Sequence, residues 1–156
     1  MDVRKIISVI VINEHGVLSR ISGLFAGRGY NIESLTVAPI PDSEFSRVTI
    51  ATVGNKRVIE QIIKQLHKLI PVYKVNEHDE MVEKELAMVK LPIDSSLADV
   101  EALCNGYNGK IANANENWLI VMVSDKPARV TNFLKAIKRF KPKEIVRSGV
   151  VAIERN

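Results

Sequence analysis

A polar tetrad separates an apolar run from a helix-like pattern near the start of the chain. Its members are Asn13, Glu14, His15 and Gly16. If a helix begins at Val17, its first N–H groups lack internal partners and carry a partial positive charge that attracts a carboxylate. Gly16 has no side chain to block a ligand, and the Asn13 amide can both donate and accept hydrogen bonds. The tetrad could therefore hold a small zwitterion.

A second candidate element follows the same helical pattern. Asn31 opens the next strand-like run, and Ile32 and Leu35 add apolar surface beside it. Together with the tetrad, these residues could recognise a small amino acid with an aliphatic side chain. The alternative is that Asn13 and Gly16 form an ordinary turn and Asn31 only follows a helix end. The residue types alone support both interpretations equally.

Other chemistry has little support in the sequence. His67 lies in a helical pattern and His78 in a charged segment, and neither has a Cys or His neighbour at metal-ligand spacing. The single cysteine, Cys104, lies in an apolar pattern that predicts a buried, inert thiol. No nucleophile motif or phosphate-binding glycine loop is present. We therefore expect neither catalytic residues nor a metal site.

Composition excludes some classes of protein. The 156 residues are 46% hydrophobic and 26% charged, as in soluble globular proteins. No apolar run approaches the ~18 to 20 residues that a membrane span needs. The N-terminal stretch lacks a signal-peptide cleavage site, so we expect a first strand there and a cytoplasmic protein with no membrane partner.

Positive charge is concentrated between residues 126 and 147. The basic residues there are Lys126, Arg129, Lys135, Lys138, Arg139, Lys141, Lys143 and Arg147. Such a surface could attract nucleic acid or an acidic protein, or it could simply be solvated. The strand-like segment 46–53 contains no aromatic residue to stack on bases, so we do not expect RNA binding of the kind seen in RNA-recognition modules.

The hydrophobic periodicity predicts two similar halves. The first half has strands at 5–12, 31–38, 46–53 and 72–75, with helices starting at Val17 and spanning about 56–69. The second half repeats this order, with strands at 86–91, 110–114, 117–124 and 144–153 and helices from Ser96 to about Cys104 and from Pro127. We expect domains at 1–78 and 85–156, joined by a linker at 79–84.

A repeated βαββαβ order predicts an α+β protein with two ferredoxin-like domains, each an antiparallel sheet covered on one face by two helices. Each domain is small, so its core is limited and its sheet edge needs protection. We therefore expect the chain to form an oligomer.

Specific segments add a family resemblance to this pattern. The segments are "NEHGVLSRISGLFAGRGYNIESLTVAP", "SRVTIATVG", "IEQIIKQLHKLIPVYKV", "EKELAMVKL" and "EIVRSGVVAIERN". Over nearly the whole chain they resemble the small regulatory subunits of acetohydroxyacid synthase, also called acetolactate synthase. One departure is Ile12, which stands where family members usually have Glu.

The resemblance implies an N-terminal ACT domain that dimerises and binds an amino acid at the dimer interface. It implies a non-enzymatic role: activating a catalytic subunit and conferring feedback inhibition by valine in branched-chain amino acid biosynthesis. Thiamine diphosphate, Mg²⁺ and FAD are then expected in the catalytic subunit and no cofactor in this chain. The implied effector-binding residues are Asn13, His15, Gly16, Val17, Leu18, Asn31 and Ile32. A free-standing amino-acid sensor acting on transcription or on another enzyme is the alternative function.

Overall fold

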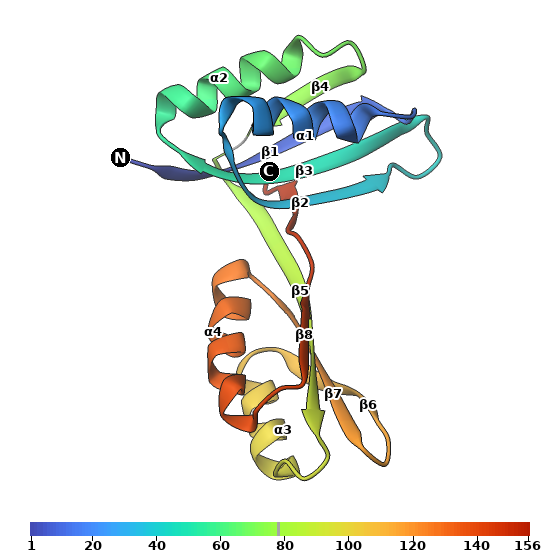
Figure 1. Ribbon diagram of the computed structural model, residues 1–156, viewed down its shortest axis with the longest axis vertical. Helices are drawn as coiled ribbons and strands as arrows, with labels where there is room; N and C mark the ends of the chain where they lie inside the picture. The colour runs from blue at the N-terminus through green and yellow to red at the C-terminus, as the bar shows by residue number, and fades with distance from the viewer. Residues whose placement is uncertain (78) are drawn as a thin grey trace. The chain divides into compact units, whose positions relative to one another are not determined.

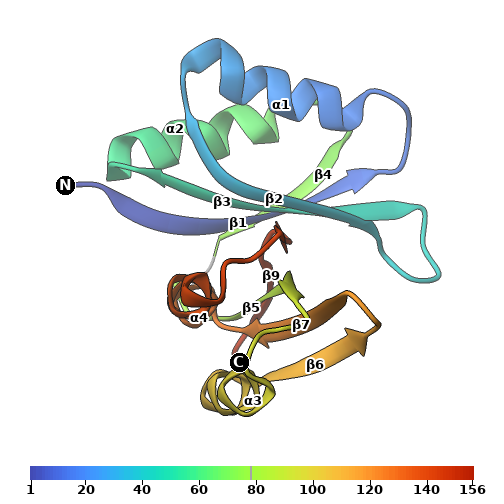
Figure 2. The ribbon, with the colours of Figure 1, turned by 60° about the horizontal axis from the view of Figure 1, so that its bottom comes forward.

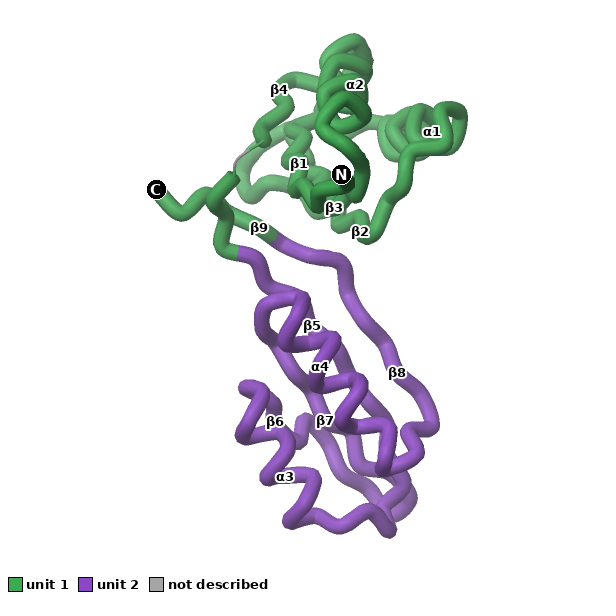
Figure 3. Tube along the Cα trace, turned by 90° about the vertical axis from the view of Figure 1, so that its left-hand side faces the viewer, with its two compact units in different colours: residues 1–82, 152–156 green, residues 83–151 purple. Residues whose placement is uncertain are grey.

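The structure is a computed structural model that describes residues 1–77 and 79–156. The chain forms two compact units, shown in different colours in Figure 3. Unit 1 comprises residues 1–82 and 152–156, and unit 2 comprises residues 83–151. Over the described residues, no helix has both the length and the apolar character needed to cross a membrane.

Unit 1 is a four-stranded antiparallel sheet with two helices on one face (Figure 1). The strands lie in the order β2-β3-β1-β4. The elements are β1 (Val3–Ile12), α1 (Val17–Arg28), β2 (Asn31–Pro39), β3 (Phe45–Gly54), α2 (Lys56–His67) and β4 (Val72–Glu77). This is the ferredoxin-like arrangement predicted from the periodicity, and each predicted element of this half is found within a few residues of its expected bounds.

Figure 2 shows the two helices of unit 1 on one face of its sheet from a second direction, and the buried core residues pack between the helices and the sheet. Alternate residues of β1, including Ile7 and Val9, face the helices and are fully buried. Helix α1 contributes Ile21 and Phe25, and α2 contributes Ile62, which are at most 1% exposed. The apolar stripes of both helices therefore close the sheet on this face.

The end of α1 fixes where β2 begins. Gly29 has φ 66°, the left-handed conformation that glycine adopts readily, and its N–H donates to Ala26 O at 3.3 Å. The Tyr30 N–H donates to Phe25 O at 3.0 Å, and the two rings meet edge to face with centroids 5.9 Å apart. This pair of hydrogen bonds with its apolar contact forms a Schellman motif, which turns the chain directly into Asn31.

Unit 2 repeats the arrangement with the strand order β6-β7-β5-β8, and Figure 1 shows its helices on one face of the sheet. Its elements are β5 (Met81–Pro92), whose first two residues belong to unit 1, α3 (Leu97–Gly106), β6 (Gly109–Ala114), β7 (Trp118–Asp125), α4 (Pro127–Ile137), the 3₁₀ turn Lys138–Phe140, and β8 (Glu144–Arg147). The Ser96 hydroxyl caps α3, which was expected to begin at this residue, by accepting from Asp99 N at 3.4 Å. Val100, Val121 and Phe133 are fully buried between helices and sheet.

The structure differs from the expected division at two places. Residues 81–84 were expected in the linker 79–84, but they belong to β5, because alternating residues from Met81 onward continue into the buried positions of that strand. The expected final strand 144–153 is split into β8 and β9 (Val151–Glu154), and residues 152–156 belong to unit 1. The expected boundary at residue 78, and His78 itself, lie outside the described residues.

Ser148 explains the interruption of the last strand. Its N–H donates to Leu86 O at 2.8 Å, but its hydroxyl, in place of a backbone carbonyl, accepts from Leu86 N at 2.9 Å. The same hydroxyl donates to Gly149 O at 2.9 Å. A side chain thus replaces a backbone partner of β5, which interrupts the regular ladder between β8 and β9, the two strands that pair with β5.

Candidate functional site

The polar tetrad forms the corner between β1 and α1. Two backbone hydrogen bonds hold the chain where it leaves the sheet: Ile12 N donates to Pro71 O and Asn13 N donates to Glu44 O, each at 3.0 Å. The Asn13 and His15 residues are exposed. The backbone of the corner is thus fixed by the sheet while its side chains face solvent.

Gly16 makes the start of α1 accessible. It has φ 82° and ψ −3°, the left-handed conformation, and a Cβ placed there would meet no heavy atom within 4 Å. The first intrahelical hydrogen bond runs from Arg20 N to Gly16 O at 3.0 Å, so the N–H groups of residues 17–19 have no acceptor inside the helix. Helix α1 also lacks a side-chain cap and an acidic residue in its first turn. Its positive end is open to an anion.

Apolar surface lies next to this helix end. Val17 is buried, at 6% exposure, whereas Leu18 is 43% exposed and Ile12 is also 43% exposed. Leu18 has the apolar character and helical spacing of Val17 and Ile21, but its side chain lies outside the core. An anion held by the N–H groups would therefore have aliphatic side chains beside it.

Asn31 and Ile32 do not join this corner within one chain. In the register of the sheet, Val53 of β3 lies opposite both Asn31 of β2 and Arg4 of β1. Asn31 is therefore level with the start of β1, whereas Asn13 follows its end. At about 3.3 Å per residue, the nine positions from Arg4 to Asn13 span roughly 30 Å. The seven predicted effector residues form two groups at opposite ends of the sheet.

Thr52, which was not among the predicted site residues, holds the backbone at Asn31 and so fixes the start of β2. The Thr52 hydroxyl donates to Asn31 O, and Thr52 is fully buried. At the same end of the sheet, Arg4 Nε of β1 donates to the Glu33 carboxylate of β2 at 2.9 Å, so this contact spans β3. These contacts join residues 21 and 29 positions apart, so the local sequence carries no signal for them.

Unit 2 uses its ionisable groups for internal pairing. Glu85 and Asp125 lie opposite each other on β5 and β7, and both are buried. The Arg147 guanidinium binds the Glu85 carboxylate at 2.7 and 3.1 Å, and Arg129 Nε donates to the Asp125 carboxylate at 2.6 Å. Hydrogen bonds from the Arg129 side chain and from the backbone N–H of Lys126 lower the pKa of Asp125.

These pairs change the interpretation of the basic stretch 126–147. Arg129, Arg139 and Arg147 each contact an acidic side chain of unit 2, with Arg139 3.6 Å from Asp99. Arg129 and Arg147 make close hydrogen bonds in these pairs, whereas the Arg139 side chain stays 65% exposed. The alternative function, a sensor that contacts nucleic acid through this stretch, gains no support.

The buried Cys104 fits its predicted role as a core residue. It is 2% exposed, and burial, with a smaller contribution from the Glu101 carboxylate, raises the pKa of its thiol. A raised pKa disfavours the nucleophilic thiolate. Among the described residues, no group of three or more His, Cys, Asp and Glu side chains is placed to hold a metal ion.

Comparison with known families defines the class of protein. Residues 7–74 match the model of the acetohydroxyacid synthase small subunit-like ACT domain, which covers the sheet and helices of unit 1. Residues 84–156 match the model named small subunit of acetolactate synthase. Unit 1 is therefore an ACT domain of the type found in acetohydroxyacid synthase small subunits.

Full-length relatives agree with both domain matches. The chain is 43% identical to the acetolactate synthase isozyme 3 small subunit of Escherichia coli, over 97% of this chain and 96% of that protein. It is 41% identical to the acetolactate synthase small subunit of Buchnera aphidicola, over 97% and 98%. The crystal structure of the small subunit from Thermotoga maritima superposes with a TM-score of 0.90 at 32% identity, covering 99% of this chain and 98% of that one. The chain belongs to the family of acetolactate synthase small subunits.

Proposed function

We propose that this chain is a non-catalytic regulatory subunit that binds and activates an acetolactate synthase catalytic subunit and makes it sensitive to valine. The family supports the association, and the open N-terminal end of α1 supports the effector. That end offers unpaired N–H groups beside Gly16, with Leu18 exposed next to them. A carboxylate is stabilised at a helix N-terminus, and an aliphatic side chain gains from contact with Leu18.

The effector site is completed by a second copy of the chain. Strand β2 is the edge of its sheet, so its outer backbone groups can pair with another strand. In a two-fold symmetric dimer, two β2 strands paired antiparallel about Leu35 would place Asn31 of one copy opposite Pro39 of the other. Pro39 is level with Ser46 and Val11, close to the corner that Asn13 begins. This arrangement unites the two groups of predicted effector residues.

Such a shared site couples valine to the arrangement of the dimer. Valine that contacts both copies favours the dimer geometry in which both halves of the site meet. If the catalytic subunit binds another geometry better, valine and the catalytic subunit oppose each other with a coupling free energy of typically ~1 to 3 kcal/mol. Valine then reduces the activation that this chain provides.

The proposed role assigns the cofactors to the catalytic subunit and places the complex in the cytoplasm. Thiamine diphosphate, Mg²⁺ and FAD would be held by the catalytic subunit and not by this chain, and the complex would be cytoplasmic.

Reconstitution tests the proposal. The purified chain is added to the catalytic subunit of the same organism, and acetolactate formation is followed with and without L-valine, while calorimetry measures binding of valine, leucine and isoleucine to the chain alone. We expect activation on mixing and its reversal by valine. A chain that leaves the catalytic rate unchanged at saturating concentration would show that the proposed partner is wrong, whereas activation without valine binding would show that only the effector is wrong.

A further inference from the structure

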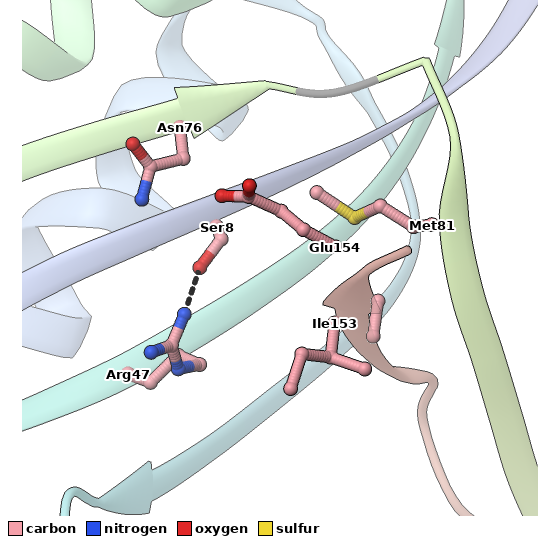
Figure 4. A pocket seen from close by; sticks show the side chains of 7 residues that line it. Ser8, Arg47, Asn76, Met81, Ile153 and Glu154 are labelled. Carbon is pink, nitrogen blue, oxygen red and sulfur yellow. Dashed lines mark hydrogen bonds between the residues drawn. The ribbon is translucent and has the colours of Figure 1, made fainter. Parts of the chain in front are cut away.

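A pocket of about 250 Å³ lies in unit 1, away from the corner before α1. It is lined by Ser8, Arg47, Asn76, Met81, Ala152, Ile153 and Glu154. All of these residues belong to unit 1, and Figure 4 draws their side chains and labels all of them except Ala152. The pocket therefore combines three strands of the ACT sheet with the last residues of the chain.

The pocket lies on the face of the sheet opposite the helices. Ser8 alternates with Ile7 and Val9, which face the helical core, so its side chain points the other way. It lies between neighbouring strands, paired with Asn76 on β4 and with Thr49 on β3. A ligand here would lie about five residues, or roughly 16 Å, along β1 from the effector corner and on the other face.

Two groups of opposite charge line this pocket. The Arg47 Nη1 donates to the Ser8 hydroxyl at 2.8 Å, which orients the guanidinium while using one of its five N–H donors. Ser8 is itself only 4% exposed, so this anchor is fixed in the sheet. Figure 4 shows Glu154 reaching the pocket from the C-terminal segment, with Met81 and Ile153 nearby. A carboxylate accepts several hydrogen bonds, so the Glu154 carboxylate can accept one from an ammonium group in addition to its contacts within the protein.

We propose that this pocket binds a small zwitterion with a short aliphatic body, such as a free aliphatic amino acid. Arg47 would hold its carboxylate, Glu154 its ammonium group, and Met81 with Ile153 would contact its apolar part. The pocket volume of about 250 Å³ leaves room for a ligand of this size. This site is independent of the effector corner, so either can exist without the other.

Residue-resolved NMR separates the two sites. The intact ¹⁵N-labelled chain is titrated with L-valine, L-leucine and L-methionine, and with isobutyrate and isobutylamine, which each carry only one of the two charges. We expect saturable amide shifts at residues 8, 47, 76 and 152–154 with at least one amino acid, and at least about tenfold weaker binding of the two analogues. Shifts confined to residues 13–18 and 31–32 would overturn binding at this pocket and leave the effector site intact. Shifts confined to residues 8, 47, 76 and 152–154 would support this pocket and overturn the effector site.

Matched variants assign the charges. Arg47→Gln is expected to raise the dissociation constant at this pocket by at least about tenfold, while Arg57→Gln, the same change on the exposed surface of α2, leaves it unchanged. Glu154→Gln should weaken binding of the amino acid but not of isobutyrate, which has no ammonium group. Equal losses for the amino acid and isobutyrate would overturn the role of Glu154, and unaltered affinity in Arg47→Gln would overturn the site.

Discussion

Substituting Gly16 by Asp places a carboxylate where the effector carboxylate is proposed to bind. The backbone at Gly16 is left-handed, which costs an ordinary L-residue about 1 to 2 kcal/mol, although Asp and Asn tolerate this region better than most. No atom lies within 4 Å of the new Cβ, so no clash adds to that cost. The negative charge also gains about 0.3 to 1 kcal/mol from the helix end. We therefore expect the variant to fold and to bind the catalytic subunit.

The effect on valine should be much larger than the effect on folding. Hydrogen bonds to a charged group contribute about 1.5 to 3 kcal/mol, and the new side chain both competes for the N–H groups of residues 17–19 and repels the ligand carboxylate. Loss of that contribution raises the dissociation constant about 10- to 150-fold. Gly16→Asn is the matched control, because it has nearly the same size and backbone preference without the charge.

Calorimetry with valine and a valine titration of the reconstituted enzyme measure this prediction. We expect strong desensitisation in Gly16→Asp, a clearly smaller loss in Gly16→Asn, and unchanged activation by both. Equal losses in the two variants would show that size and not charge matters. An Asp variant with the sensitivity of the original chain would refute the placement of the effector at this helix end.

Three further predictions test other parts of the structure. Asp125→Asn should lower the thermal midpoint of unfolding at pH 7, because hydrogen bonding to Arg129 lowers the pKa of the Asp125 carboxyl in the folded protein. This stabilisation is lost as the pH falls through the lowered pKa, so the difference in midpoint between the variant and the original chain should shrink progressively below about pH 4. A difference that stays constant down to about pH 2 would contradict this explanation. Asn55→Ala removes the side chain that accepts a hydrogen bond from the first turn of α2 and should lower the free energy of unfolding in denaturant by about 0.5 to 2 kcal/mol, whereas Asn55→Asp should lower it little. Identical unfolding curves for the two variants and the original chain would rule out the cap. Leu18→Ala should weaken valine binding with little change in stability, whereas Ile21→Ala, at a fully buried position, should lower the free energy of unfolding by about 2 to 5 kcal/mol. A Leu18 variant as unstable as the Ile21 variant would place Leu18 in the core.

Local chemistry made much of this fold predictable. The left-handed Gly29 and the apolar spacing of Ile21 and Phe25 both act within one helix, so the sequence pattern reports them directly. The same holds for Ser96, whose capping bond spans three residues. At these positions, periodicity and end signals agree with the tertiary structure, and the predicted elements are found in place.

Long-range contacts decided what the sequence could not indicate. Leu18 fits the helical stripe, but only the packing of α1 on the sheet leaves its side chain exposed. The final segment has one continuous apolar pattern, yet Ser148 interrupts it through bonds to Leu86, 62 residues away. Strand register likewise separates Asn13 from Asn31, although only one helix lies between them in sequence. None of these outcomes has a signal within a local window.

The most direct test of a shared effector site uses mixed dimers of two defective chains. Gly16→Asp disables one half of the site and Asn31→Ala the other, and each variant alone should bind valine weakly. If each site combines the Gly16 corner of one copy with Asn31 of the other, a mixed dimer carries one doubly altered site and one intact site. Random mixing in equal amounts should then restore about a quarter of the sites at the original affinity. No restoration, in mixtures shown to contain mixed dimers, would contradict a site built from two copies.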